Sequence, residues 1–159
     1  MKATIVSDTS SLIILAKIER LVLLEHLFEK VFIPKSVAGE LAKKEDGIHQ
    51  TITNSPLYEV VECENPELLA LLDELLDKGE AEALALAKEK HLILLIDEKK
   101  GRKIARKMHI EILGFLGILL LNYRHKHLNK ADIKDILHQA EQLDFRLSER
   151  LKHDFFTKL

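Results

Sequence analysis

The chain has 159 residues, of which 47% are hydrophobic and 31% are charged, with a formal net charge of −2 and a single cysteine, Cys63. This length and apolar content predict one globular domain over residues 1–159, and one cysteine excludes a disulfide framework and a cysteine-rich zinc site. The longest apolar run, residues 112–121, is far shorter than the roughly 20 residues that cross a bilayer. We therefore expect a cytoplasmic protein with no membrane partner.

The first half of the chain alternates strand and helix patterns. Short apolar runs predict strands, and helices are predicted where apolar periodicity follows residues that favour helix starts. The strands are predicted over residues 3–8, 30–33 and 58–62. The helices are predicted over residues 9–18, 20–28, 34–44 and 65–76, with a weaker helical stretch between Gly47 and Pro56.

The second half continues the alternation. Residues 92–96 form a continuous apolar run, which is typical of a strand buried on both faces of a parallel sheet. Lys78-Gly79 is expected to break the preceding helix, and a short strand is expected over 110–113. Helices are predicted over residues 80–90, 99–108, 114–125, 129–142 and 147–158. About five alternations of strand and helix indicate an α/β fold in which helices cover both faces of a parallel sheet.

Two carboxylates stand at predicted strand ends. Asp8 ends the first strand and Asp97 ends the strongest one. Ligands of such sheets bind outside the carboxyl ends of the strands, and a charge beside a buried strand is costly unless it is paired. Each aspartate could instead cap a helix, with Asp8 accepting from amides of the turn over residues 9–11.

Three glutamates extend this acidic set. Glu40 is flanked by apolar positions, Glu80 opens a helix, and Glu98 follows Asp97. Glu80 could simply favour a helix N-terminus, by about 0.3–1 kcal/mol. Two carboxylates 4 Å apart repel by about 4 kcal/mol at an effective dielectric of 20, so a cluster needs a cation or shared protons. Oxygen ligands alone favour Mg²⁺ or Mn²⁺, which would activate water against a phosphodiester.

Charge is distributed unevenly. Residues 59–98 hold 12 acids and 3 bases, and residues 99–130 hold 9 bases and 1 acid. The blocks are either solvated helix faces or an acidic centre beside a basic rim, which would suit a nuclease. Lys99, Arg102 and Arg106 follow Asp97, where they would bind an RNA backbone or serve solubility.

Five segments resemble a known family. The first four are Asp8-Thr9-Ser10-Ser11-Leu12-Ile13, Val37-x-x-Glu40-Leu41, Gly79-Glu80-Ala-Glu-Ala-Leu-Ala-Leu-Ala87 and Leu95-Ile-Asp97-Glu98. In this order they resemble a PIN domain. The fifth, Arg102-x-x-Ala105 followed by Gly114-Phe-Leu-Gly117-Ile-Leu, resembles a small prokaryotic PIN subfamily related to VapC-type toxins.

The resemblance implies a Rossmann-like three-layer α/β/α sandwich with four or five parallel strands. It also implies an endoribonuclease that uses Mg²⁺ or Mn²⁺ to cleave single-stranded RNA, often a homodimer and, among toxins, paired with a small antitoxin. Positions matching the family's functional residues are Asp8, Glu40 and Asp97 as metal carboxylates, Glu80 where Asp is usual, Glu98 where many members carry a further Asp, Thr9 and Ser10 as nearby hydroxyls, and Arg102.

Two other functions compete. A PIN-like domain that binds RNA or protein without cutting would fit the Glu-for-Asp replacements and the mild net charge. A phosphatase or receiver-type protein would use Asp8 as phospho-acceptor, but no second Asp stands two residues on.

Overall fold

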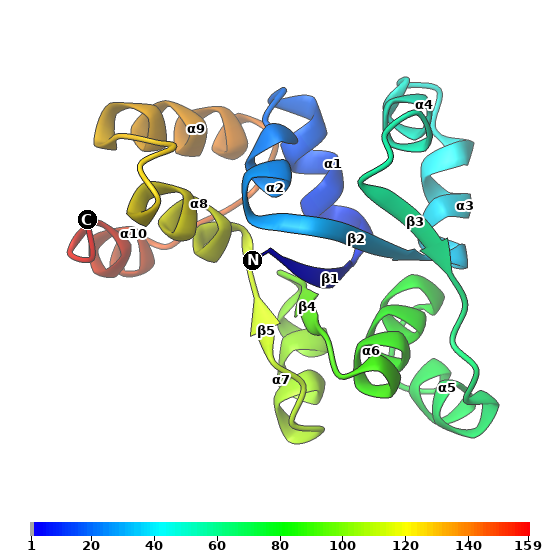
Figure 1. Cartoon of the computed structure of the whole chain (residues 1–159). Helices are drawn as coiled ribbons and strands as arrows, with labels where there is room; N and C mark the ends of the chain where they lie inside the picture. The colour runs from blue at the N-terminus through cyan, green and yellow to red at the C-terminus, as the bar shows by residue number, and fades with distance from the viewer. Residues whose placement is uncertain (1) are drawn as a thin grey trace.

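Five parallel strands form the centre of the fold (Figure 1). The computed structural model describes residues 2–159. The sheet order is β3-β2-β1-β4-β5, and each neighbouring pair is parallel. The strands are β1 Ala3–Ser7, β2 Phe28–Pro34, β3 Tyr58–Val61, β4 Ile93–Leu95 and β5 Ile112–Leu113.

Helices connect the strands and complete the C-terminal part of the chain. In residues 2–159 they are α1 Thr9–Lys17, α2 Val22–Leu27, α3 Lys35–Lys43, α4 Ile48–Thr53, α5 Pro66–Asp73, α6 Lys78–Lys90, α7 Lys99–Lys107, α8 Phe115–Arg124, α9 Lys130–Gln142 and α10 Glu149–Phe156. No helix within these residues is long and apolar enough to span a bilayer.

The helices cover both faces of the sheet. Because side chains alternate along a strand, Ile5 of β1 packs into one core, with α1–α4 and α8–α10, while Val6 packs into the other, with α5–α7. In Figure 1 the first set lies mainly above the sheet and the second below it. The predicted three-layer α/β/α sandwich with four or five parallel strands is therefore confirmed, and its sheet has five.

Strand order creates the edge at which ligands of α/β sheets bind. The chain builds outward from β1 to β2 and β3 on one side, and then to β4 and β5 on the other. This reversal is a topological switch point, and a crevice is expected there at the carboxyl ends of the strands. Ser7 of β1 is in register with Leu95 of β4, and the Asp8 N–H donates to the Leu95 carbonyl at 3.1 Å. Asp8 and Asp97 consequently lie at the same edge.

One predicted boundary is wrong. Lys78-Gly79 does not break a helix but forms the first turn of α6, which is capped by Asp77. The Asp77 side chain accepts the Glu80 N–H at 2.9 Å. Helix α5 ends earlier, at Asp73. Gly79 is therefore not a turn residue, and its lack of a side chain allows a close contact with Glu40 instead.

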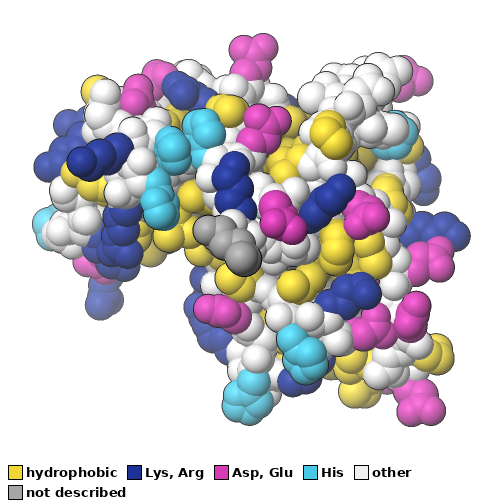
Figure 2. All heavy atoms as spheres, viewed as in Figure 1, with side chains coloured by type: hydrophobic (Ala, Val, Ile, Leu, Met, Phe, Trp, Pro, Cys, Tyr) yellow, Lys and Arg dark blue, Asp and Glu magenta, His cyan; other side chains and the backbone are white. Residues whose placement is uncertain are grey.

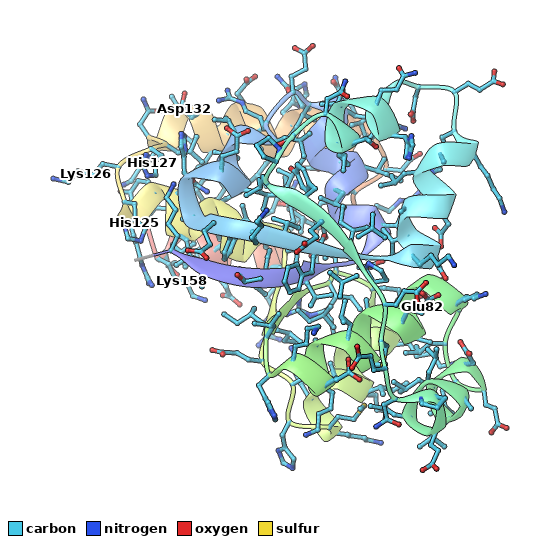
Figure 3. The ribbon with its side chains drawn as sticks, turned by 45° about the vertical axis from the view of Figure 1, so that its right-hand side comes forward. Glu82, His125, Lys126, His127, Asp132 and Lys158 are labelled. Carbon is cyan, nitrogen blue, oxygen red and sulfur yellow. The ribbon has the colours of Figure 1, made fainter. Side chains whose placement is uncertain are left out.

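A buried polar contact holds α8 against α2. Asn122, fully buried on α8, donates through Nδ2 to the Leu23 carbonyl of α2 at 3.1 Å. His26 lies 3.4 Å from Asn122 Oδ1 and stacks on His127 with ring centroids 4.1 Å apart. His127 is labelled in Figure 3 beyond the end of α8. These contacts fix the C-terminal end of a helix whose N-terminus faces Asp97.

Candidate functional site

Asp8 is the most buried carboxylate at this edge. It follows β1 directly and is only 3% exposed. Its Oδ1 accepts the Thr9 N–H, so Asp8 caps α1. Helix capping was one of the two roles that the sequence suggested for this residue. Its Oδ2 is buried and has no hydrogen-bond partner within residues 2–159. The capping role therefore accounts for only one of the two oxygens.

Asp97 is held from two neighbouring elements. Its Oδ2 accepts the Ser11 hydroxyl of α1 at 2.7 Å. Both of its oxygens accept the N–H of Phe115, the first residue of α8, at 3.0 and 3.2 Å. A β-carbon on Gly114 would lie 2.8 Å from both Asp97 Oδ1 and Arg102 Nη1, so glycine there lets α8 approach the carboxylate. Asp97 thus has a fixed orientation.

Glu40 reaches the site through another glycine contact. It lies on α3, where its side chain is exposed. A β-carbon added to Gly79 would stand 2.7 Å from Glu40 Oε1. Gly79 therefore makes room for the Glu40 carboxylate against the first turn of α6.

Asp77, Glu80 and Glu98 form a second acidic group. Glu98 caps α7 by accepting the Gly101 N–H at 2.6 Å, and Asp77 caps α6. Burial raises the pKa of Glu80 to about 9, helped by hydrogen bonding of its protonated form to Asp77 and Glu98. Burial also acts to raise the pKa of Glu98, but the Gly101 and Lys100 amides and the bond with Glu80 outweigh it and lower that pKa. The pKa of Glu80 is therefore raised and that of Glu98 is lowered within this group.

The charges around Asp8 link the two groups. Burial is the main cause that raises the Asp8 pKa from 3.8 to about 6, and the Thr9 amide partly opposes it. The negative charges of Asp77, Glu40 and Asp97 raise it further. Three other carboxylates therefore act on Asp8. One of them, Asp77, also acts on Glu80 in the second acidic group. Within residues 2–159, however, no three His, Cys, Asp or Glu side chains are gathered closely enough to hold a metal ion.

The donor chemistry nevertheless fits a hard divalent cation. Every acidic ligand here is a carboxylate oxygen, the type that Mg²⁺ and Mn²⁺ prefer. Asp8 Oδ2 and Glu80 Oε2 are buried without a partner in the described chain, so a cation would relieve both. Glu40 and Glu98 are exposed, and exposed side chains change rotamer readily.

Comparison with known families decides the assignment. A family model described as "DUF3368: PIN domain" matches residues 4–159. The chain belongs to the PIN domain family. PIN domains are usually nucleases, in general metal-dependent ribonucleases. No curated protein matches the chain.

The predicted site residues of this PIN domain differ in their burial and in their contacts. Glu40 and Asp97 both raise the pKa of Asp8, and Glu80 and Glu98 are grouped with Asp77, which also raises it. Two hydroxyl residues were predicted near the site. The backbone N–H of Thr9, and not its hydroxyl, donates to Asp8, and Ser10 is exposed. On α7, Lys99 and Arg106 are exposed, and half-buried Arg102 donates to the Ile96 carbonyl at 2.7 Å.

Two site residues were missed in the sequence. Ser11 supplies the hydroxyl that binds Asp97, one position beyond Ser10. Asp77 is the cap of α6, and the spacing Asp77-Lys-Gly-Glu80 matches a helix capping box, a signal that could have found it.

The raised pKa of Asp8 predicts how stability depends on pH. The folded protein binds this proton more tightly than the unfolded chain, so its contribution is present below pH 3.8 and is lost as pH rises through about 6. The change amounts to at most about 3 kcal/mol. In urea unfolding with EDTA, the free energy of unfolding of Asp8→Asn relative to wild type is expected to increase by about 1–3 kcal/mol between pH 4 and pH 7.5. Asp73→Asn, on the surface of α5, is the control, and an unchanged difference for Asp8→Asn would contradict the prediction.

Proposed function

We propose that this PIN domain is a metal-dependent endoribonuclease that hydrolyses phosphodiester bonds of single-stranded RNA, with Asp8, Glu40, Glu80 and Asp97 as its catalytic carboxylates. One observation carries the proposal. The partnerless Asp8 Oδ2 is buried among the charges of other carboxylates, at the carboxyl edge of the sheet. Burying a carboxylate without a partner costs folding free energy, and carboxylates perturbed in this way are common at functional sites.

Mg²⁺ or Mn²⁺ would be held by Asp8, Glu40 and Asp97, together with Glu80 and Glu98. The bound ion would make water more acidic and neutralise charge on the phosphodiester. Because the pKa of Glu80 is raised to about 9, metal binding at this carboxylate at neutral pH would release a proton. Affinity for the metal is accordingly expected to rise with pH.

The chain's own residues orient the reactants. Ser11 and the Phe115 amide fix Asp97, so that carboxylate needs no reorganisation when substrate binds. Arg102 lies beside Asp97 and, with Lys99 and Arg106 on the same helix, would bind the phosphates of RNA.

A non-catalytic PIN domain that binds RNA or protein is the second candidate. The absence of a ready-made three-residue metal group within residues 2–159 favours it. The toxin role, the small antitoxin and the homodimer remain predictions from the sequence resemblance.

Cleavage of labelled single-stranded RNA tests the function. Wild type is expected to cut with Mn²⁺ or Mg²⁺ and to stop in EDTA, and Asp8→Asn is expected to lose at least about 100-fold in rate, because the most buried carboxylate is removed. The control Asp73→Asn should cleave normally. Metal should also raise the melting temperature of wild type more than that of Asp8→Asn. A folded wild type that neither cleaves nor is stabilised by metal would support the non-catalytic candidate.

The Gly79 contact allows activity to be separated from stability. In Gly79→Ala the new methyl group displaces the flexible Glu40 carboxylate, while alanine favours the helix by up to about 1 kcal/mol. We expect an unchanged or higher melting temperature with cleavage lowered about 10- to 100-fold. Gly39→Ala, on α3 with nothing within 4 Å of the added carbon, is the matched control and should keep full activity. Equal activity of the two variants would show that the position of Glu40 does not matter.

A further inference from the structure

A groove of about 560 Å³ begins at Asp97 and runs along the C-terminal part of the molecule. One wall comes from α7, β5 and α8, and the other from residues 145–158, which include α10. In Figure 2 the lobe at the left and the lobe below it are separated by a recess, with Lys and Arg side chains on both lobes. Figure 1 shows that α8–α10 form the left lobe and that α7 and β5 belong to the lower one.

Four cations line this groove. Arg102 and Arg106 are one turn apart on α7, and Arg146 and Lys158 lie on the opposite wall. Besides Asp97, the only acidic residue in the lining is Asp154. Within residues 2–159 the ion pairs involve other cations, so Arg106, Arg146 and Lys158 have no carboxylate partner. Lys158 is labelled in Figure 3 on the C-terminal lobe. The groove therefore favours an anionic ligand.

The floor of the groove is largely apolar. Leu116 of α8, Phe145 and Leu147 are partly exposed there, and Leu151 of α10 is 46% exposed. Unstacked bases of a single strand can lie on apolar and aromatic side chains while the phosphates contact cations. A duplex would offer its phosphates but not its base faces to such a floor.

We propose that single-stranded RNA extends from the carboxylate site along this groove, with Arg146 and Lys158 of the C-terminal segment binding phosphates that flank the cleaved bond. The proposal rests on the proposed function, since it makes Asp97 the end of the groove at which chemistry occurs. An acidic, apolar peptide would also find cations and an apolar floor. RNA is favoured because the groove is continuous with the basic helix α7 and ends at a site suited to phosphodiesters.

Binding without cleavage tests the groove. A fluorescein-labelled 12-nucleotide single-stranded RNA is titrated with the full chain in EDTA, and affinity is followed by anisotropy from 50 to 300 mM salt. Arg146→Gln and Lys158→Gln are each expected to weaken binding about fivefold at 0.1 M salt and to reduce the salt slope by about 0.7. Arg150→Gln on α10 and Lys134→Gln on α9, which lie outside the groove, are the controls and should match wild type.

A variant that binds RNA more tightly than wild type cannot owe its effect to misfolding. Leu151→Lys adds a cation to the groove and is expected to tighten RNA binding about fivefold, whereas Leu151→Glu, of similar size, should weaken it. Melting temperatures of all variants are compared with wild type. Unchanged affinity and salt slope in all four groove variants would overturn the proposal, as would a peptide of acidic and apolar residues that binds the groove while RNA does not.

The two proposals fail in different ways. If RNA binds in the groove but wild type never cleaves it with metal, the groove stands and the nuclease function fails. If wild type cleaves in an Asp8-dependent manner and Arg146→Gln and Lys158→Gln change neither affinity nor KM, the function stands and the groove is rejected.

Discussion

Repulsion between carboxylates at one edge of a parallel sheet is the constraint around which this structure is arranged. Such repulsion costs several kcal/mol per close pair unless it is offset. The chain offsets part of it with helix N-termini, where amides and the helix dipole favour negative charge. Four helices begin at this edge, and each places amides against a carboxylate: α1 at Asp8, α6 at Asp77, α7 at Glu98 and α8 at Asp97.

This compensation is incomplete, and its gaps define the chemistry of the site. Both oxygens of Asp97 are bound by the protein, whereas Asp8 Oδ2 and Glu80 Oε2 are buried without a partner in the described chain. The pKa values of these two residues are raised, to about 6 for Asp8 and about 9 for Glu80, so a proton relieves the repulsion at each residue only below its own pKa. A divalent cation would replace the protons at the same oxygens. Asp97 would then serve as the rigid part of the site, and Asp8 and Glu80 as the part that responds to ligand and pH.

The sequence predicted the fold and the strand-end acids because both follow from local patterns. Asp8 and Asp97 directly end apolar runs, and parallel strands bring such ends together. The roles of Ser11 and Gly79 were not identified, because they depend on which elements meet. The Ser11 hydroxyl on α1 donates to Asp97, which follows the neighbouring strand β4, and Gly79 matters because α3 brings Glu40 to it. Arg146 is likewise far from the site in sequence. It enters the groove only through the packing of the C-terminal segment beside α8.

Location of a bound metal is the most direct test of the central claim. Crystals grown with excess Mn²⁺ would be measured at a wavelength where manganese scatters anomalously. The account predicts a peak at the carboxyl edge of the sheet within coordination distance, about 2.0–2.6 Å, of Asp8 and Asp97 oxygens. Well-diffracting crystals saturated with Mn²⁺ that show no peak there would contradict it, because the carboxylate cluster would then have no role in binding metal.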